Sequence, residues 1–181
     1  MTSLATIQIR TLPQSIEEFR TLRDQIAKTP QGGAAIMVLA LYLYTQDKTL
    51  GQQCLTVAID SKNLEEGPHG YHGWQLHRND SERIRRQLAA QPYLPLSYLK
   101  GATPENNYNL PPLPYTLEFS SNPYSGDETS GPYKVFTACS GAPSPRPITL
   151  RKNNREIWKA YEWSSLVVGI RKPKSENDDT L

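Results

Sequence analysis

The sequence predicts an α+β fold, with N-terminal helices packed on a C-terminal antiparallel sheet of four to five strands. Residues 145–171 alternate apolar and polar side chains on both sides of an Asn153-Asn154 turn, which is typical of antiparallel strands. The chain before about residue 100 instead carries apolar side chains at helical spacing. The two halves must therefore cover each other's apolar faces.

The length of the chain fits one domain. A chain of 181 residues can bury a sizeable core without disulfides or metal, and we expect a single domain over residues 1–173. Its helical part is expected over about 14–100 and its sheet part over about 115–171. Residues 174–181 are polar, which predicts a disordered tail.

Four helices are expected in the first half. Ser15-Ile-Glu-Glu18 is a capping box for a helix over 16–28. The apolar run 34–44, which follows the helix-starting pair Thr29-Pro30, predicts a buried central helix far shorter than the ~20 residues that span a bilayer. Two further helices are expected over 49–59 and after Asp80 or Ser81. The Gly32-Gly33 pair fits either a loose loop or a close approach of two backbones.

The second half is predicted to consist of a connector and strands. Prolines interrupt residues 92–114, which predicts an ordered connector with one short helical turn over 95–99. Five strands are predicted by alternation, at 115–120, 133–140, 148–152, 157–163 and 166–170.

Composition excludes some classes of partner. The net charge of +2, from 20 basic and 18 acidic residues, gives no field that would attract nucleic acid or an anionic membrane. The N-terminus has no basic region leading into an apolar run, so we expect no signal peptide and a cytoplasmic location. Cys54 and Cys139 are isolated, which favours buried thiols over a disulfide.

Motifs that cover almost the whole chain carry a family resemblance. They are Leu12-Pro-Gln-Ser-Ile-Glu-Glu-Phe19, Gly101-Ala-Thr-Pro-Glu-Asn-Asn-Tyr108, Asn122-Pro-Tyr-Ser125, Ser140-Gly-Ala-Pro-Ser-Pro-Arg-Pro147, Trp158, Glu162-Trp-Ser-Ser165 and Ile170-Arg-Lys-Pro173. Together they resemble a bacterial family known only as a domain of unknown function. The resemblance implies a complete single domain with its recurring polar residues in the connector and sheet half, and it implies no activity.

The three histidines of the chain, His69, His72 and His77, are the clearest candidates for metal ligands, although they lie outside the family pattern. Their spacing could bring two imidazoles to one metal ion, but the segment 68–77 contains no Cys, Asp or Glu. We therefore expect no metal and no cofactor. No catalytic residue is assigned, because Cys139 has no histidine nearby in sequence and Ser140-Gly-Ala lacks the GxSxG pattern.

Arginines concentrate in and just before the last helix that is predicted ahead of the connector. Arg78, Arg83, Arg85 and Arg86 form the densest positive charge in the chain. A solvated helix face is the expected interpretation, and an anionic partner is the alternative.

Asn107, Tyr108 and Arg146 are the candidate ligand-binding residues. In the functional interpretation they line a shallow polar pocket where the connector crosses the sheet, and Arg146 binds a carboxylate or phosphate. In the structural interpretation the asparagine satisfies loop backbone groups, while Arg151 and Glu162 form a cross-strand ion pair.

Two functions remain open. Because no catalytic motif is assembled, we favour a non-catalytic binding or protein-interaction module of a bacterial cytoplasmic protein, with a protein or peptide partner. The alternative is a small-ligand-binding or enzymatic domain with a pocket between the helices and a curved sheet. Neither nucleic acid nor membrane is expected as a partner, and the oligomeric state stays open.

Overall fold

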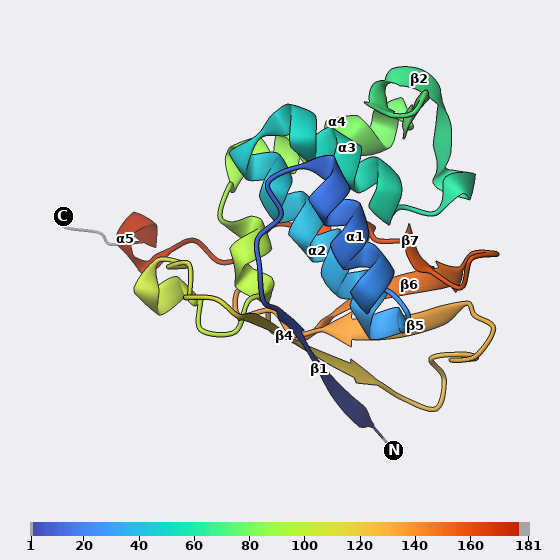
Figure 1. Ribbon diagram of the computed structural model, residues 1–181. Helices are drawn as coiled ribbons and strands as arrows, with labels where there is room; N and C mark the ends of the chain where they lie inside the picture. Colours follow the sequence, from blue (N-terminus) through green and yellow to red (C-terminus); the bar gives the residue numbers. More distant parts are fainter. Residues whose placement is uncertain (1, 178–181) are drawn as a thin grey trace.

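The computed structural model describes residues 2–177 and has the expected α+β fold. Helices α1 to α4 gather on one side of an antiparallel sheet with the strand order β1-β4-β5-β6-β7 (Figure 1). The α-helices are α1 Ile16–Ile26, α2 Pro30–Gln46, α3 Lys48–Ala58, α4 Arg78–Ala90 and α5 Lys174–Asn177. The strands are β1 Ser3–Ile9, β2 Leu64–Tyr71, β3 Trp74–Leu76, β4 Tyr115–Ser121, β5 Tyr133–Thr137, β6 Arg146–Lys152 and β7 Trp158–Glu162. Short 3₁₀ helices are η1 Ser61–Asn63, η2 Leu94–Tyr98, η3 Pro104–Asn106 and η4 Ser164–Val167.

Helix α2 is the centre of the core, as its apolar run predicts. The Thr29 side chain accepts a hydrogen bond from Gly32 N at 3.0 Å, and Pro30 occupies the first turn, where its missing N–H costs nothing. The helix contacts α3 and the strands β1, β5, β6 and β7. One cluster of buried apolar side chains, from Ile9 to Ile170, therefore joins helices and sheet.

The Gly32-Gly33 pair serves close packing, which decides between the two interpretations of the sequence. Both glycines are buried inside α2. A Cβ atom at Gly33 would lie 2.6 Å from the carbonyl oxygen of Trp158 in β7. The backbone of α2 therefore rests directly on the sheet at this point.

The expected division into a helical half and a sheet half is wrong in two places. Strand β1 lies at the N-terminus and pairs with β4 from Ser3↔Ser121 to Ile9↔Tyr115. A second sheet, the β2–β3 hairpin, lies between α3 and α4. The alternation in β1 is short, with Ile7 and Ile9 turned inward, and the strand gains its stability from β4, far away in the sequence.

The strand predicted at 166–170 is also wrong. Residues 164–167 form η4, and the backbone beyond them is bound by side chains instead of by a neighbouring strand. The fifth strand of the main sheet is therefore β1, while β4 to β7 lie close to the ranges predicted for them.

Two helix ends differ from the expectation. Helix α4 begins at Arg78, with His77 as its N-cap residue, before the predicted caps at Asp80 or Ser81, and its inward side chains Ile84 and Leu88 are buried as expected. The predicted tail does not begin at Lys174, because α5 forms there; residues 178–181 lie outside the described part of the chain. Within residues 2–177, no helix combines the length and the apolar character needed to cross a bilayer.

Candidate functional site

Asn107, Tyr108 and Arg146 all hold one segment, residues 166–175, which we call the C-terminal strap. The Tyr108 hydroxyl donates to the Arg171 carbonyl at 2.6 Å, and Asn107 Oδ1 accepts from Ser175 N at 3.0 Å. The Arg146 guanidinium donates to the carbonyls of Val168 and, at 2.7 Å, of Gly169. Side chains from the connector and from the start of β6 thus bind the backbone of the same strap.

Two residues that the sequence did not single out bind the same strap. The Gln91 side chain donates to the Ile170 carbonyl and accepts from Ile170 N, both at 2.9 Å. The Tyr98 hydroxyl donates to the Leu166 carbonyl at 2.6 Å. These bonds engage the backbone groups that strand pairing would need, which explains why the predicted strand at 166–170 does not form.

Tyr108 is part of the core rather than an exposed loop residue. Its side chain is 1% exposed and stacks on Tyr93, with ring centroids 5.1 Å apart. Burial and then the nearby Cys139 thiol raise the pKa of Tyr108 to about 12. The chain's own strap occupies the polar groups of this residue, so binding of an external ligand by Asn107, Tyr108 and Arg146 stays a prediction.

Arg146→Ala is expected to lower the free energy of unfolding by about 1–3 kcal/mol, because two strap carbonyls lose a charged donor. Urea unfolding followed by circular dichroism measures this loss. Arg83→Ala, at an exposed position of α4, is the control and should change stability little. Equal stability of the two variants would contradict the structural role of Arg146.

Arg151 makes a different contact from the expected one. It lies opposite Lys159 in the β6–β7 ladder, and its guanidinium carbon is 4.9 Å from the centre of the Tyr161 ring. A cation–π contact therefore takes the place of the expected pair with Glu162.

His69 and His72 lie in the β2–β3 hairpin, which was not expected from the sequence, and His77 follows the hairpin as the N-cap residue of α4. His72 and Gly73, with φ of 51° and 84°, make a two-residue turn between the paired Tyr71 and Trp74. Two successive residues with positive φ are typical of a type I′ hairpin turn, where asparagine and glycine are the usual residues. The sequence contains one sign of this turn, the glycine at Gly73 between the aromatic residues Tyr71 and Trp74. The sign is weak because a histidine stands before the glycine, where asparagine is usual.

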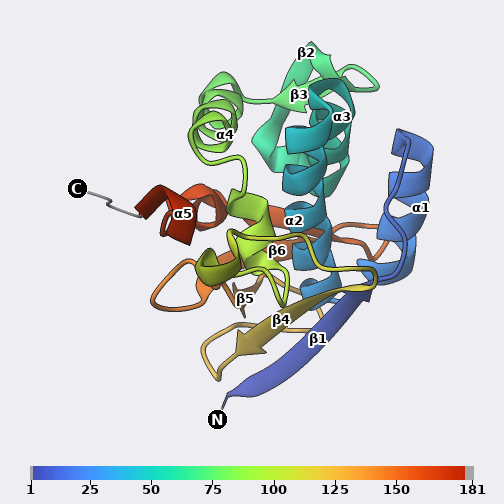
Figure 2. The same cartoon turned by 90° about the vertical axis from the view of Figure 1, so that its left-hand side faces the viewer.

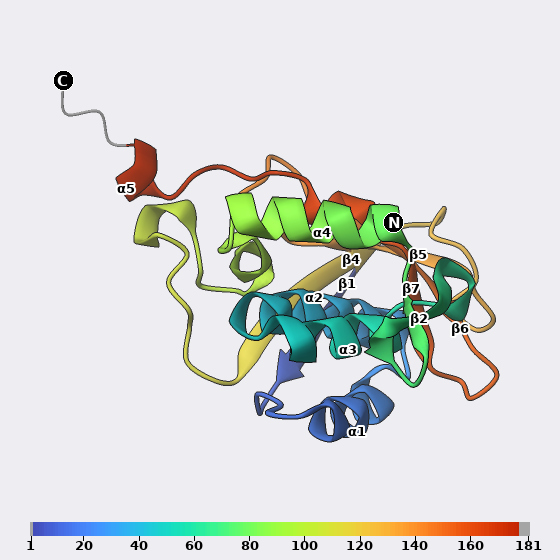
Figure 3. The same cartoon turned by 90° about the horizontal axis from the view of Figure 1, so that it is seen from above.

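A cleft lies between this hairpin and the helices α3 and α4, and we call it the hairpin cleft. Figures 2 and 3 both place the hairpin beside α3 and α4. The cavity has a volume of about 470 Å³, which falls in the range usual for small-molecule sites. Leu55, Leu76 and Ile84 form apolar parts of its lining.

Glu65 organises the hairpin wall of the cleft. His77 Nδ1 lies 2.8 Å from Glu65 Oε1, and Gln75 Nε2 donates to Glu65 Oε2 at 3.2 Å. Gln75 Oε1 in turn accepts from His69 N at 3.1 Å. The hydrogen bond from His77, and then that from Gln75, lower the pKa of Glu65, so the carboxylate is ionised and oriented at neutral pH.

The helical wall of the cleft is cationic. Arg85 donates to both carboxylate oxygens of Glu82, at 2.8 and 3.3 Å, and this contact lowers the pKa of Glu82. Arg78 and Lys48 complete the basic lining, and the Lys48 ammonium has no ion pair with any residue between 2 and 177. The arginines of α4 are thus divided, since Arg78 and Arg85 line the cleft while Arg83 and Arg86 lie outside its lining.

The three histidines do not form a metal centre in the described structure. His72 stacks on Tyr71, with ring centroids 3.8 Å apart, and His77 pairs with Glu65. Between residues 2 and 177, no three His, Cys, Asp or Glu side chains are placed to hold one metal ion. Absence of metal from the protein itself stays a prediction.

Comparison with known proteins gives a family and no activity. No curated protein matches the chain, and no solved structure matches it. A family model matches residues 11–174, which include α1 to α4, the hairpin, β4 to β7 and most of the strap. The chain therefore belongs to the family described as Domain of unknown function (DUF6935).

Proposed function

We propose that this chain is a non-catalytic binding module of a bacterial cytoplasmic protein, and that it holds a small organic acid in the hairpin cleft. The observation that carries the proposal is the combination of apolar side chains with the basic residues Lys48, Arg78 and Arg85 in the lining of one cavity of about 470 Å³. Ligand sites commonly combine an apolar lining with a few oriented polar groups.

The charges of the cleft favour an acid. Both carboxylates in the lining, Glu65 and Glu82, already accept hydrogen bonds from His77, Gln75 and Arg85. Lys48 and Arg78 remain available to an incoming carboxylate, since neither forms an ion pair within residues 2–177. An apolar group on the same ligand would lie against Leu55, Leu76 and Ile84.

This assignment favours the small-ligand alternative over a protein or peptide partner. A protein interface normally buries about 800 Å² on each partner, whereas a cleft of this volume has room for a small molecule. The cleft lies between helices and the hairpin, and not between helices and the main sheet as the sequence-based alternative supposed.

Small aliphatic and aromatic carboxylic acids are expected to bind in the hairpin cleft and to shift the amide NMR signals of residues such as Gln52, Leu76 and Ser81, which line it. Arg78→Gln should weaken this binding about tenfold, which corresponds to the loss of one charged contact. Arg83→Gln makes the same change on the same helix outside the cleft, and should leave the affinity unchanged. Equal losses in the two variants, or signal shifts confined to other surfaces, would contradict the proposal.

General acid–base catalysis is a second candidate function, and the His77–Glu65 pair favours it. A carboxylate 2.8 Å from an imidazole nitrogen fixes the orientation of the ring, which a general base requires. In that case an ester bound beside Glu65 in the cleft is hydrolysed by water to an acid and an alcohol, and His77→Gln, outside the lining itself, abolishes the hydrolysis while binding persists. Product analysis by NMR in the same titrations separates the two candidates.

A further inference from the structure

Strand β1 leaves one edge of the main sheet open. It stands at the end of the strand order β1-β4-β5-β6-β7, and within residues 2–177 only β4 is hydrogen-bonded to it. Figures 1 and 2 both show β1 at the margin of the molecule, with no other segment along its outer side. One side of its backbone therefore carries donors and acceptors that no other part of the described chain uses.

The pairing with β4 shows which residues carry these open groups. In an antiparallel strand the N–H and C=O of one residue point to the same side, and successive residues alternate between the two sides. The Glu118 carbonyl of β4 accepts from Ala138 N at 2.9 Å, on the side away from β1. Thr6 lies opposite Glu118, so the two residues form a pair without mutual hydrogen bonds. The backbone groups of Thr6, and of Leu4 and Gln8 two residues away, therefore face the open side.

Strand β1 has none of the features that usually keep an edge strand from pairing. Such strands are commonly protected by a lysine, a proline or a β-bulge. The sequence of β1, Ser-Leu-Ala-Thr-Ile-Gln-Ile, contains no charge and no proline, and its pairing with β4 runs through all seven residues without a register shift. Leu4 is 83% exposed and adds an apolar side chain to this edge. The strand can therefore accept a further strand along its whole length.

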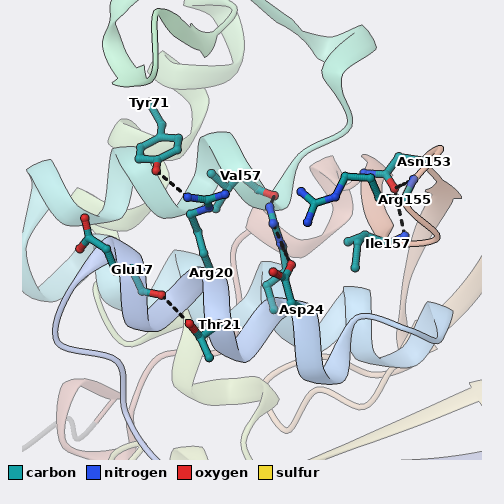
Figure 4. Close-up of polar contacts among 10 residues, drawn as sticks. Glu17, Arg20, Thr21, Asp24, Val57, Tyr71, Asn153, Arg155 and Ile157 are labelled. Carbon is teal, nitrogen blue, oxygen red and sulfur yellow. Dashed lines mark hydrogen bonds and ion pairs between the residues drawn. The ribbon is translucent and has the colours of Figure 1, made fainter.

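The other edge strand, β7, shows how this chain closes an edge. Trp158 N donates to the Ala27 carbonyl at 2.8 Å. Asp60 N donates to the Ala160 carbonyl at 2.8 Å, so the segments after α1 and α3 occupy outer groups of β7. Figure 4 shows the Arg155 side chain reaching from the turn before β7 toward α1. No segment between residues 2 and 177 covers β1 in this way, although both strands end the same sheet.

We propose that β1 pairs with β1 of a second copy of this chain, antiparallel and about a two-fold axis at Thr6. In this register Thr6 pairs with the partner's Thr6, and Leu4 and Gln8 pair with the partner's Gln8 and Leu4. Each of these pairs exchanges two backbone hydrogen bonds. The two five-stranded sheets then form one continuous sheet across the dimer.

The side chains of β1 suit pairing with a copy of themselves. A two-fold axis places the same surface of both copies in contact, so a charged strand would meet its own charge. Thr6 instead meets the partner's Thr6, which is a favourable cross-strand pair. On the face toward the helices, the half-buried Ala5 lies opposite the partner's Ile7, so that a small side chain meets a large one. Arg10, the only charged residue in the range 2–10, falls after the strand and opposite the partner's Thr2.

A second copy is favoured over a strand of another protein because symmetry supplies all of these matches at once. The net charge of +2 adds little repulsion between two copies. A strand of seven residues at about 3.3 Å per residue gives a contact roughly 23 Å long, so the association is expected to be reversible. The chain should be a monomer in dilute solution and a dimer at high concentration.

Sedimentation velocity over a series of concentrations tests the association of the full chain. A reversible monomer–dimer equilibrium is expected. A chain that is still monomeric at about 1 mM would overturn the proposal, and would leave the open edge to a strand of another protein.

Amide hydrogen exchange followed by NMR tests where the copies meet. The amides of Leu4, Thr6 and Gln8 should become protected as the concentration rises, because they gain partners only in the dimer. The amides of Ala5 and Ile7, which face β4, should be protected at every concentration. A dimer without this alternating pattern would place the interface elsewhere and overturn the proposal.

Charge exchange at the two-fold axis tests the register. Thr6→Lys and Thr6→Glu each place like charges opposite each other, and each should weaken dimerisation at least about tenfold. An equal mixture of the two variants should restore it, since a lysine then meets a glutamate. Thr6 is exposed, so circular dichroism should show both monomers folded as the wild type is. Variants that dimerise like the wild type, or a mixture that does not recover, would overturn the proposal.

Thr116→Lys is the matched control, because it makes the same change on the neighbouring strand β4, away from the open edge. It should leave dimerisation unchanged. The inference goes beyond the function proposed for the hairpin cleft and does not depend on it, since no residue of β1 lines that cleft. Arg78→Gln should therefore weaken acid binding without affecting the dimer, so failure of either proposal is distinguishable from failure of the other.

Discussion

Leu39→Asp is expected to leave no folded protein. Leu39 is 2% exposed and lies in the middle of α2, which packs against α3 and the sheet. An unpaired carboxylate at this place costs several kcal/mol, and the total stability of a domain is only about 5–15 kcal/mol. Circular dichroism and the yield of soluble protein measure the outcome.

Leu4→Asp is the matched control for this change. Leu4 lies on the edge strand β1 and is 83% exposed, so the same substitution there buries no charge. It should leave the melting temperature nearly unchanged. A Leu39→Asp variant that unfolds cooperatively at the temperature of the wild type would show that α2 is not the centre of the core.

Gly33→Ala is expected to destabilise the protein by about 1–3 kcal/mol, the usual cost of overpacking. Helix propensity alone predicts a gain in stability, because alanine is more favourable than glycine inside a helix by about 1 kcal/mol. The steric clash outweighs this gain, since the new Cβ would lie 2.6 Å from the Trp158 carbonyl oxygen, a backbone atom of the sheet. Only the Leu150 methyl group, at 2.7 Å, belongs to a side chain that can rotate away.

Gly169→Ala provides the comparison. A Cβ at Gly169 would approach no atom closer than 3.6 Å, which is ordinary van der Waals contact. Urea unfolding of the two variants should therefore give a large loss for Gly33 and a small one for Gly169. A gain in stability at Gly33 would mean that α2 can move away from β7, and that the close approach is not required.

The candidate site could be predicted only in part. The connector motif and Arg146 were recognised as unusual polar positions, and the structure brings them to one segment, but that segment is the chain's own strap. A sequence shows that an arginine is present and does not show which carbonyl it will meet. The hairpin cleft was not predicted at all, because its lining comes from α2, α3, both hairpin strands and α4.

The sequence by itself determined the elements whose signals are local. Helices α1 and α2 follow from caps at Ser15 and Thr29 and from apolar spacing, α3 follows from apolar spacing alone, and β4 to β7 follow from alternation along the strand. Each of these signals extends over fewer than about 20 residues and is therefore readable without knowing what lies opposite.

Tertiary structure alone decided the rest. Strand β1 exists because β4, more than 100 residues later, offers it a partner. The segment after η4 is a strap and not a strand because Gln91 and Arg146 occupy the backbone groups that a neighbouring strand would need. Both outcomes depend on contacts between residues that are far apart in the sequence. Such contacts stabilise the protein only once the chain has folded around α2 and brought these residues together.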